Sequence, residues 1–259
     1  MSNTKRPKRP APLKKQGMPR GQQGIVIGVV ALCVLALIPI PLLLNRGGDD
    51  ASPTASSNPS PASVDAVTCD DPPSAPTEGK TYPSPPPASL SENTTWEAVI
   101  HTTCGDIRVE LDGKAAPQTV ASFIYLARDD YWNDGPCHRL TTAASSIFVL
   151  QCGDPTGTGT VQPPYGFGVE NAPADGNYPR RTVAMARGSD PNSNGGQFFF
   201  VYKDTQLPTD SGGYSIFGQV TEGMQVVDAI AAQGGKDNGS DAPPSQPISI
   251  LSVDVQKKS

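Results

Sequence analysis

The residues of this chain that could do chemistry gather around one arginine, Arg139. It follows His138 in a segment with strand character, and Gln151 and Gln197 occur in two later segments of the same kind. A guanidinium held in place is a cationic donor that can stabilise charge as it develops in a reaction. The aromatic run Phe198–Phe200, next to Gln197, adds apolar surface. We therefore take these strand-borne residues as the candidate functional group.

Other chemistries find little support in the sequence. The chain has two histidines and no serine-hydrolase, zinc-protease, phosphate-loop or dinucleotide-binding motif. A hydrolytic triad needs a histidine beside a hydroxyl or thiol. His138 next to Cys137 could serve, although a structural histidine is the favoured interpretation. No cluster of His, Cys and Asp has the spacing of metal ligands, so neither a metal nor another cofactor is expected. The segment Gly153–Gly159 is not followed by a lysine and a helix, which favours a surface loop over a phosphate site.

Periodic structure that could position these residues begins at Trp96 and leaves 164 residues, which suits one domain. Residues 107–111 alternate in polarity as a strand does. Residues 115–127 carry an apolar stripe of helical period with Pro117 in the first turn, and a second helix is expected over 224–231. Many short strands between glycine- and proline-rich loops indicate a mainly β domain, a closed antiparallel barrel capped at its ends. Further strands are expected at 137–140, 148–151, 182–186, 197–201, 214–220 and 248–255.

The strand-borne residues belong to six short motifs that resemble, in the same order, those of the cyclophilin family of peptidyl-prolyl isomerases. The resemblance runs from about Ile107 to Val255. Each motif alone is weak, whereas six in order over one domain are hard to obtain by chance. The motifs are Ala116–Phe123, His138–Arg139, Gln151–Gly159, Ala184–Ala186, Asn192–Phe199 and Phe217–Ile230.

The resemblance implies a cyclophilin-like barrel of eight antiparallel strands with two helices. It also implies an enzyme that catalyses cis–trans exchange at X–Pro bonds without a cofactor. By position, Arg139 is the catalytic donor, and Gln151 orients it and binds substrate backbone. Ala186 and Arg187 fall on the strand whose backbone pairs with the peptide, where a different side chain at 187 need not matter. The implied substrate-binding residues are Phe148, Val149, Ala186, Arg187, Gln197, Phe199, Leu207 and Tyr214.

Strand alternation divides the aromatic run by face. Phe198 and Phe200 project to one side of the strand and Phe199 to the other. Core packing explains the first two residues, which leaves Phe199 for the proline pocket that the resemblance implies.

The chain departs from the family pattern in three connections. The segment Leu140–Ile147 after Arg139 is longer than usual, and so are 185–197 and 207–217. Gln206 stands where many eukaryotic members have the tryptophan that binds cyclosporin. These departures leave Arg139 in place and predict a loop that bulges beside the site.

The N-terminal part of the chain predicts membrane attachment. Residues 1–23 carry seven Lys and Arg and no acidic residue, and residues 24–44 are uncharged and long enough to span a bilayer. This asymmetry places the N-terminus in the cytoplasm and the rest of the chain outside. A cleaved signal peptide would have a shorter apolar run, and Leu32 before Cys33 disfavours lipidation. With the motifs, this layout is similar to membrane-anchored cyclophilins of actinobacterial type.

Residues 45–91 predict a disordered linker. They are rich in Pro, Ser, Ala and Thr and lack the apolar surface needed to offset the entropy lost on ordering. The domain is therefore expected to occupy residues 92–259. Without the seven cations of the tail, the chain has 13 Lys and Arg against 25 Asp and Glu, a net charge of −12. This acidic balance argues against nucleic acid as a partner of the exposed part.

Four cysteines lie beyond the predicted membrane span. An even number in an oxidising compartment permits disulfides, with three possible pairings. Cys137 and Cys152 flank one expected antiparallel strand pair and are the first choice. The other two are Cys69 and Cys104, and free buried thiols remain an open alternative.

The leading functional hypothesis is a monomeric peptidyl-prolyl isomerase domain that acts on proline-containing segments of exported proteins as they fold outside the membrane. The alternative is a non-catalytic proline-peptide binding or chaperone module at the cell surface. The presence of Arg139 with Gln151 favours the enzyme. A passive stalk protein would explain residues 1–91 but not the polar residues around Arg139.

Overall fold

Two long strands, β1 (Thr95–Thr102) and β2 (Gly105–Asp112), begin the fold because their residues alternate in polarity. In β1, Trp96 and Ile100 are buried while the residues between buried positions are partly exposed. Burying a large apolar side chain contributes roughly 1.5–3 kcal/mol, so this alternation commits each strand to one face. The structure, a computed structural model, describes residues 67–259.

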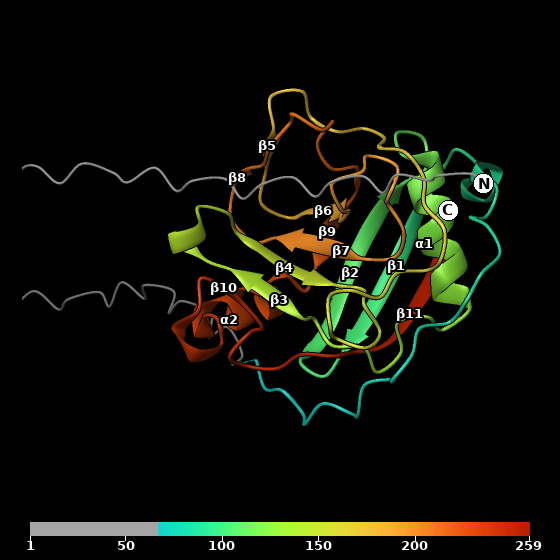
Figure 1. Cartoon of the computed structure of the whole chain (residues 1–259). Helices are drawn as coiled ribbons and strands as arrows, with labels where there is room; N and C mark the ends of the chain where they lie inside the picture. Colours follow the sequence, from blue (N-terminus) through green and yellow to red (C-terminus); the bar gives the residue numbers. More distant parts are fainter. Residues whose placement is uncertain (1–66) are drawn as a thin grey trace, which may run out of the picture. The chain divides into compact units, whose positions relative to one another are not determined.

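In the described part of the chain, nine antiparallel strands form one curled sheet, shown in Figure 1. A separate ribbon pairs β5 (Asn177–Tyr178) with β8 (Thr205–Gln206). The order across the large sheet is β10 (Asp241–Ala242), β3 (Arg139–Thr141), β4 (Val149–Cys152), β7 (Phe198–Val201), β6 (Thr182–Met185), β9 (Ile216–Glu222), β2, β1 and β11 (Ile250–Lys257).

The two ends of the curled sheet meet beside β3 and β11. Cys137, just before β3, donates its backbone N–H to Ile248 at 2.9 Å, and Ile250 donates to Gly135 at 2.8 Å. The resemblance implies eight strands, whereas the described residues form nine in this sheet. The difference arises because the two-residue strand β10 pairs with the outer edge of β3.

The helices α1 (Pro117–Arg128) and α2 (Met224–Gln233) confirm the two predicted helices to within two residues at each end. α1 lies against β11 and β2, and α2 lies against β2. The carboxylate of Glu170 accepts the backbone N–H groups of Gln118 and Thr119 at 3.0 and 2.8 Å. It thereby satisfies donors that the first turn of a helix leaves free.

The described connections also contain the short 3-10 helices η1 (Ala88–Ser91), η2 (Ala143–Ser145) and η3 (Lys236–Asn238).

The curled sheet separates two apolar clusters. Its inner face forms the main core, which includes Leu150, Phe198 and Phe200. Its outer face carries a smaller cluster that includes Val149 and Phe199. The predicted division of the aromatic run is therefore confirmed, because successive side chains of β7 point to opposite faces.

Residues 67–91, which we call the strap, lie along the domain although their composition predicts linker up to residue 91 (Figure 1). Tyr82 is only 6% exposed and donates its hydroxyl to Asp129 at 2.7 Å. Gln118 donates its side-chain amide to the carbonyl of Pro86 at 2.9 Å. The ordered unit thus starts before residue 92. The composition of the strap does not reveal this earlier start, because one buried aromatic residue and one disulfide are enough to hold a proline-rich segment.

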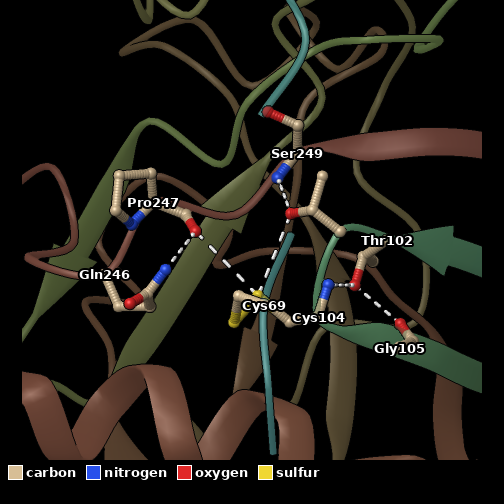
Figure 2. Close-up of a disulfide and its surroundings, with 8 residues drawn as sticks. Cys69, Thr102, Cys104, Gly105, Gln246, Pro247 and Ser249 are labelled. Carbon is tan, nitrogen blue, oxygen red and sulfur yellow. Dashed lines mark hydrogen bonds between the residues drawn. A yellow bond between two sulfur atoms is a disulfide. The ribbon is translucent and has the colours of Figure 1, made fainter. Parts of the chain in front are cut away.

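Two disulfides are present among the described residues. Cys137 pairs with Cys152, which confirms the predicted pairing and settles the alternative of free thiols. Cys69 of the strap pairs with Cys104 in the β1–β2 turn. Figure 2 shows this second bond beside Thr102, whose hydroxyl oxygen accepts the backbone N–H of Cys104 at 3.1 Å. The strap is therefore fastened covalently at one end and by Tyr82 further along.

The predicted basic tail (1–23), the predicted membrane span (24–44) and the first part of the predicted linker (45–66) lie outside the described residues. Within residues 67–259, none of the helices combines the length and the apolar character needed to cross a membrane.

Candidate active site

Arg139 lies on β3 directly opposite Gln151 on β4. Its Nη1 donates to the side-chain oxygen of Gln151 at 3.0 Å. Gln151 is in turn opposite Phe199 on β7, and Phe199 is opposite Ala184 on β6. These four residues form one row across neighbouring strands on the outer face of the sheet, which we call the site row. The sheet register thus brings together residues that are far apart in sequence.

A chain of amide hydrogen bonds orients Gln151. Its side-chain nitrogen donates to Gln197 Oε1 at 2.9 Å. The Gln197 side chain is buried and donates to the carbonyls of Gly159 and Val161 at 3.2 and 3.1 Å. Because each amide has distinct donor and acceptor atoms, this chain leaves the oxygen of Gln151 to face Arg139. The glycine-rich loop therefore supports the site row, as a shaped loop and not as a phosphate cradle.

The glycine-rich loop is itself held by Asp154, which is fully buried. Its carboxylate accepts hydrogen bonds from the backbone of Thr156 and Val161 at 2.7 and 2.9 Å, and from the hydroxyl of Thr158 at 3.1 Å. Burial raises the pKa of Asp154, but these hydrogen bonds outweigh it and hold the pKa below its ordinary value. The carboxylate is therefore charged at neutral pH and keeps the loop in one shape.

His138 has a structural place behind the site row. A Cβ atom on Gly159 would lie 3.2 Å from the His138 ring, so the glycine permits the close approach of the loop. Burial lowers the pKa of His138, Asp154 opposes this and Arg139 reinforces it, which keeps the ring neutral at neutral pH. Its neighbour Cys137 is in a disulfide and cannot act as a nucleophile. His138 and Cys137 therefore do not form the hydrolytic site that the sequence left open.

The outer-face apolar cluster includes Phe199 and Ala184 of the site row. The ring of Tyr214 stands edge-on to Phe199, with centroids 5.7 Å apart. Leu207 is 8% exposed and Ala186 is 7% exposed, so both side chains are buried. Five residues implied by the family resemblance meet here, namely Val149, Ala186, Phe199, Leu207 and Tyr214.

Phe148 takes a different position from the one that the resemblance implies. Its ring packs edge-on to Tyr202 at 5.8 Å and under the ammonium of Lys203 at 4.6 Å. The outer-face cluster instead receives Ile147. The signal for this exchange is in the sequence, because residues 147, 149 and 151 alternate onto one face of β4 and of the two residues before it.

Arg187 fastens the longer connection 207–217. Its guanidinium donates to the carbonyls of Gly213, Ser211 and Gly188 at 2.8, 2.9 and 2.9 Å. It also lies over the ring of Tyr214, 5.0 Å from the centroid. The sequence suggests that this side chain need not matter, whereas the structure shows that it holds the loop bearing Tyr214. A cleft beside Arg187 continues the site row and is lined by Gln151, Thr160, Gln162, Ala186, Ser193 and Gln197.

Asp241 is the polar residue of the site that the sequence does not reveal. Its carboxylate accepts from Arg139 Nε at 2.7 Å and from Nη2 at 2.9 Å. The hydrogen bond to Arg139 lowers the pKa of Asp241, and the same bond raises the pKa of Arg139. Asp241 stands in a glycine- and proline-rich segment that has the composition of a loop, so no local pattern points to it.

The fold and the site row define a domain of the cyclophilin class: a curled β-sheet that presents an oriented guanidinium beside an apolar cluster on its outer face. Comparisons agree with this class. The family model described as cyclophilin type peptidyl-prolyl cis-trans isomerase/CLD matches residues 98–255. The chain belongs to this family.

The sequence of the chain is also similar to those of curated mycobacterial proteins. The probable peptidyl-prolyl cis-trans isomerase B of Mycobacterium leprae is 38% identical over 200 residues, which cover 72% of this chain and 66% of that protein. Its namesake in Mycobacterium tuberculosis is 39% identical over 166 residues, covering 59% of this chain and 52% of that protein. The chain thus matches between about half and two thirds of the length of these relatives.

Solved structures show the same fold. A Cryptosporidium parvum cyclophilin-type isomerase is 27% identical with a TM-score of 0.52, covering 64% of this chain and 99% of that one. Its crystal structure in the presence of the dipeptide Ala-Pro matches with a TM-score of 0.51, again at 27% identity, covering 62% of this chain and 99% of that one.

Proposed function

We propose that the domain accelerates cis–trans isomerisation of X–Pro bonds in proteins that fold outside the cytoplasm. The observation that carries this proposal is the site row, in which Arg139, Gln151 and Phe199 are direct neighbours across three strands. The row sets a charged donor next to an apolar cluster that includes aromatic side chains. Both parts are needed to hold a proline and act on the bond before it.

The proposed reaction is rotation about the amide bond that precedes a proline. Rotation about an X–Pro bond meets a barrier of ~18–20 kcal/mol because amide resonance is lost on the way. In the twisted state the proline nitrogen becomes pyramidal and gains a free lone pair. A guanidinium N–H directed at this nitrogen binds the twisted state more strongly than the planar one, which lowers the barrier. No bond is broken, and no cofactor is required.

The substrate follows from the shape of the site. The proline ring would bind against the apolar cluster that contains Val149, Phe199, Leu207 and Tyr214. The preceding residues would run past Ala186, with Gln151 near their backbone, into the cleft beside Arg187. The related Cryptosporidium parvum structure obtained in the presence of Ala-Pro supports a proline-containing peptide as the ligand class.

The proposed place of action is outside the cytoplasm, with the chain anchored by one N-terminal span. Two disulfides support an oxidising compartment, because cytosolic proteins rarely keep them. The basic residues before the apolar run 24–44 support this orientation. The proposed partners are proline-containing segments of exported proteins. Protease added to intact cells should remove the domain and spare the tail, and full protection until lysis would reject this orientation.

The activity is tested with the full-length protein in detergent and a short X–Pro peptide. Exchange between cis and trans forms, followed by NMR exchange spectroscopy, should become faster when the protein is added. Buffers without reductant keep both disulfides formed. A protein that binds the peptide without changing the exchange rate would be a binding module, and the proposed function would then be rejected.

A further inference from the structure

Asp241 and Arg139 form a side-on pair on the outer face of the sheet. The two residues are 102 positions apart in sequence, and both oxygens of the carboxylate are used. The Arg139 side chain is 35% exposed and that of Asp241 is 50% exposed. Ion pairs at this exposure add little to folding stability, because water screens them. Stability is therefore a weak explanation for the geometry of this pair.

The backbone places Asp241 beside Arg139. β10 pairs with β3 so that Asp241 is opposite Thr141 and Ala242 is opposite Leu140. Thr142 adds a further bond by donating its N–H to the carbonyl of Ser240 at 2.9 Å. The carboxylate is thus carried by a strand and not by a free loop. A strand-borne group is a precise support for a neighbouring side chain.

The partners of Arg139 determine which of its donors a substrate can meet. Arginine has five N–H groups. Asp241 accepts from Nε and Nη2, and Gln151 accepts from Nη1. Among the described residues, these bonds leave one N–H on Nη1 and one on Nη2, the two terminal nitrogens. Because Asp241 and Gln151 bind different nitrogens, they fix the plane of the guanidinium even though the arginine side chain is long and flexible.

Removal of Asp241 should have opposite effects on catalysis, depending on whether the charge of Arg139 or the orientation of its guanidinium matters. If only the positive charge of Arg139 mattered, a carboxylate beside it would weaken the site, and its removal would speed catalysis. If the direction of the two terminal N–H groups matters, a bidentate partner strengthens the site, because it selects one orientation of the planar fork. The two-point contact with a strand-borne carboxylate favours orientation.

We propose that Asp241 is a positioning residue for catalysis, which holds the guanidinium of Arg139 so that its two free terminal N–H groups face the outer-face apolar cluster where the proline would bind. The inference rests on the proposed isomerase function and deepens it. Asp241 itself does not touch the substrate. Its contribution therefore exists only while Arg139 is present.

The experiment is a double-mutant cycle in the full-length protein with Asp241→Ala, Arg139→Ala and the double variant. Asp241→Asn removes the charge but keeps one acceptor of the same shape. Asp237→Asn is the matched control, since Asp237 is exposed on η3 of the same segment. Exchange rates of an X–Pro peptide give kcat and KM, and circular dichroism reports folding.

Asp241→Ala should lower kcat/KM about tenfold, mostly through kcat, because misorientation of a catalytic group weakens the transition state more than the bound substrate. Asp241→Asn should lose less, and Asp237→Asn should match the wild type. In the Arg139→Ala background, Asp241→Ala should have no further effect. A similar loss in that background would show a role independent of Arg139 and overturn the inference, as would Asp241 variants with unchanged or increased activity.

A second measurement does not depend on catalysis. The Nε–H signal of Arg139 in a proton–nitrogen NMR spectrum should be protected from exchange with water in the wild type and in Asp237→Asn. It should broaden or disappear in Asp241→Ala. An unchanged signal would show that the pair does not hold the guanidinium, which overturns the inference even if wild-type activity is normal. A wild type without isomerase activity but with the protected signal would reject the proposed function and leave Asp241 only as an ion-pair partner.

Discussion

Arg139 on β3 and Gln151 on β4 are a directly opposed cross-strand pair, and the Nη1–Oε1 distance is 3.0 Å. Gln151 is the only one of the two with a further amide partner, Gln197. The pair therefore joins the charged donor of the site to the buried loop behind it. Substitution of Arg139 or Gln151 should therefore affect activity in a different way from substitution of the apolar residues in the outer-face cluster.

Arg139→Ala should lower kcat/KM by about 10²–10³, the usual loss when a preorganised donor to developing charge is removed, or ~2.7–4 kcal/mol. The domain should stay folded, because the side chain lies on the outer face. Arg139→Lys should recover only part of the activity, since a point charge lacks the planar fork. The measurement is the isomerisation rate with circular dichroism as the folding control. A folded Arg139→Ala protein with near wild-type kcat/KM would refute the mechanism.

Phe199→Ala and Phe198→Ala should separate binding from stability. Phe199 lies in the outer-face cluster, so its loss should mainly raise KM for an X–Pro peptide. Phe198 lies in the inner core and is fully buried, so its loss should lower the free energy of unfolding by about 3–5 kcal/mol. Urea unfolding and peptide titration measure the two effects. Equal effects on KM from both changes would contradict the division of faces.

Cys137→Ser with Cys152→Ser should lower both stability and activity. The disulfide spans 15 residues, and a closed loop of this length contributes roughly 3 kcal/mol. It also joins the segments that carry Arg139 and Gln151, so kcat/KM should fall even at temperatures where the protein is folded.

The control for the disulfide is Cys69→Ser with Cys104→Ser. This bond spans 35 residues, for which the loop model gives roughly 4 kcal/mol, and it joins the strap to the β1–β2 turn. The control should lose stability and keep its kcat/KM in the folded protein. Equal losses of activity in both double variants would show that the Cys137–Cys152 bond has no special effect on the site.

His101 should make stability depend on pH. Its hydrogen bond to Asp106 raises the pKa above the ordinary 6.5, burial opposes this, and Asp254 adds to the rise. The stabilisation is therefore fully present below pH 6.5 and lost as pH rises through the higher folded pKa. The effect should be small, since the His101 side chain is 34% exposed.

The measurement is the difference in Tm between the wild type and His101→Gln at about pH 6 and about pH 9. The wild-type advantage should shrink at the higher pH. His138, with its lowered pKa, acts in the opposite direction but is common to both proteins and cancels in the difference. An advantage that grows with pH would contradict the assignment.

Gln206→Trp should tighten the binding of cyclosporin. Gln206 is exposed on β8 next to Leu207 of the outer-face cluster. The family resemblance implies a tryptophan at this position in many eukaryotic members. An indole adds a large apolar face and one N–H donor at this rim. Isothermal titration should show stronger binding for Gln206→Trp and little change for Gln206→Ala. No gain from tryptophan would mean that residue 206 does not contact the ligand.

Much of the fold can be predicted from the sequence because its signals are local. The polarity of residues 107–111 in β2 alternates with period two, so Ile107, Val109 and Leu111 identify its buried face. The same rule assigns Phe198 and Phe200 to the core and Phe199 to the outer face. The family motifs add Arg139 and Gln151, but as positions along a chain and without a distance between them.

The tertiary structure alone decided two features. Asp241 reaches Arg139 because β10 pairs with the edge of β3, and such a pairing over 102 residues leaves no local pattern in a loop-like segment. The strap is ordered because Tyr82 and Cys69 find partners on the domain, whereas composition averages over the prolines around them. Residues close in sequence share a local geometry that periodicity reveals, but contacts between distant segments depend on sheet register and curl, which only the folded chain determines.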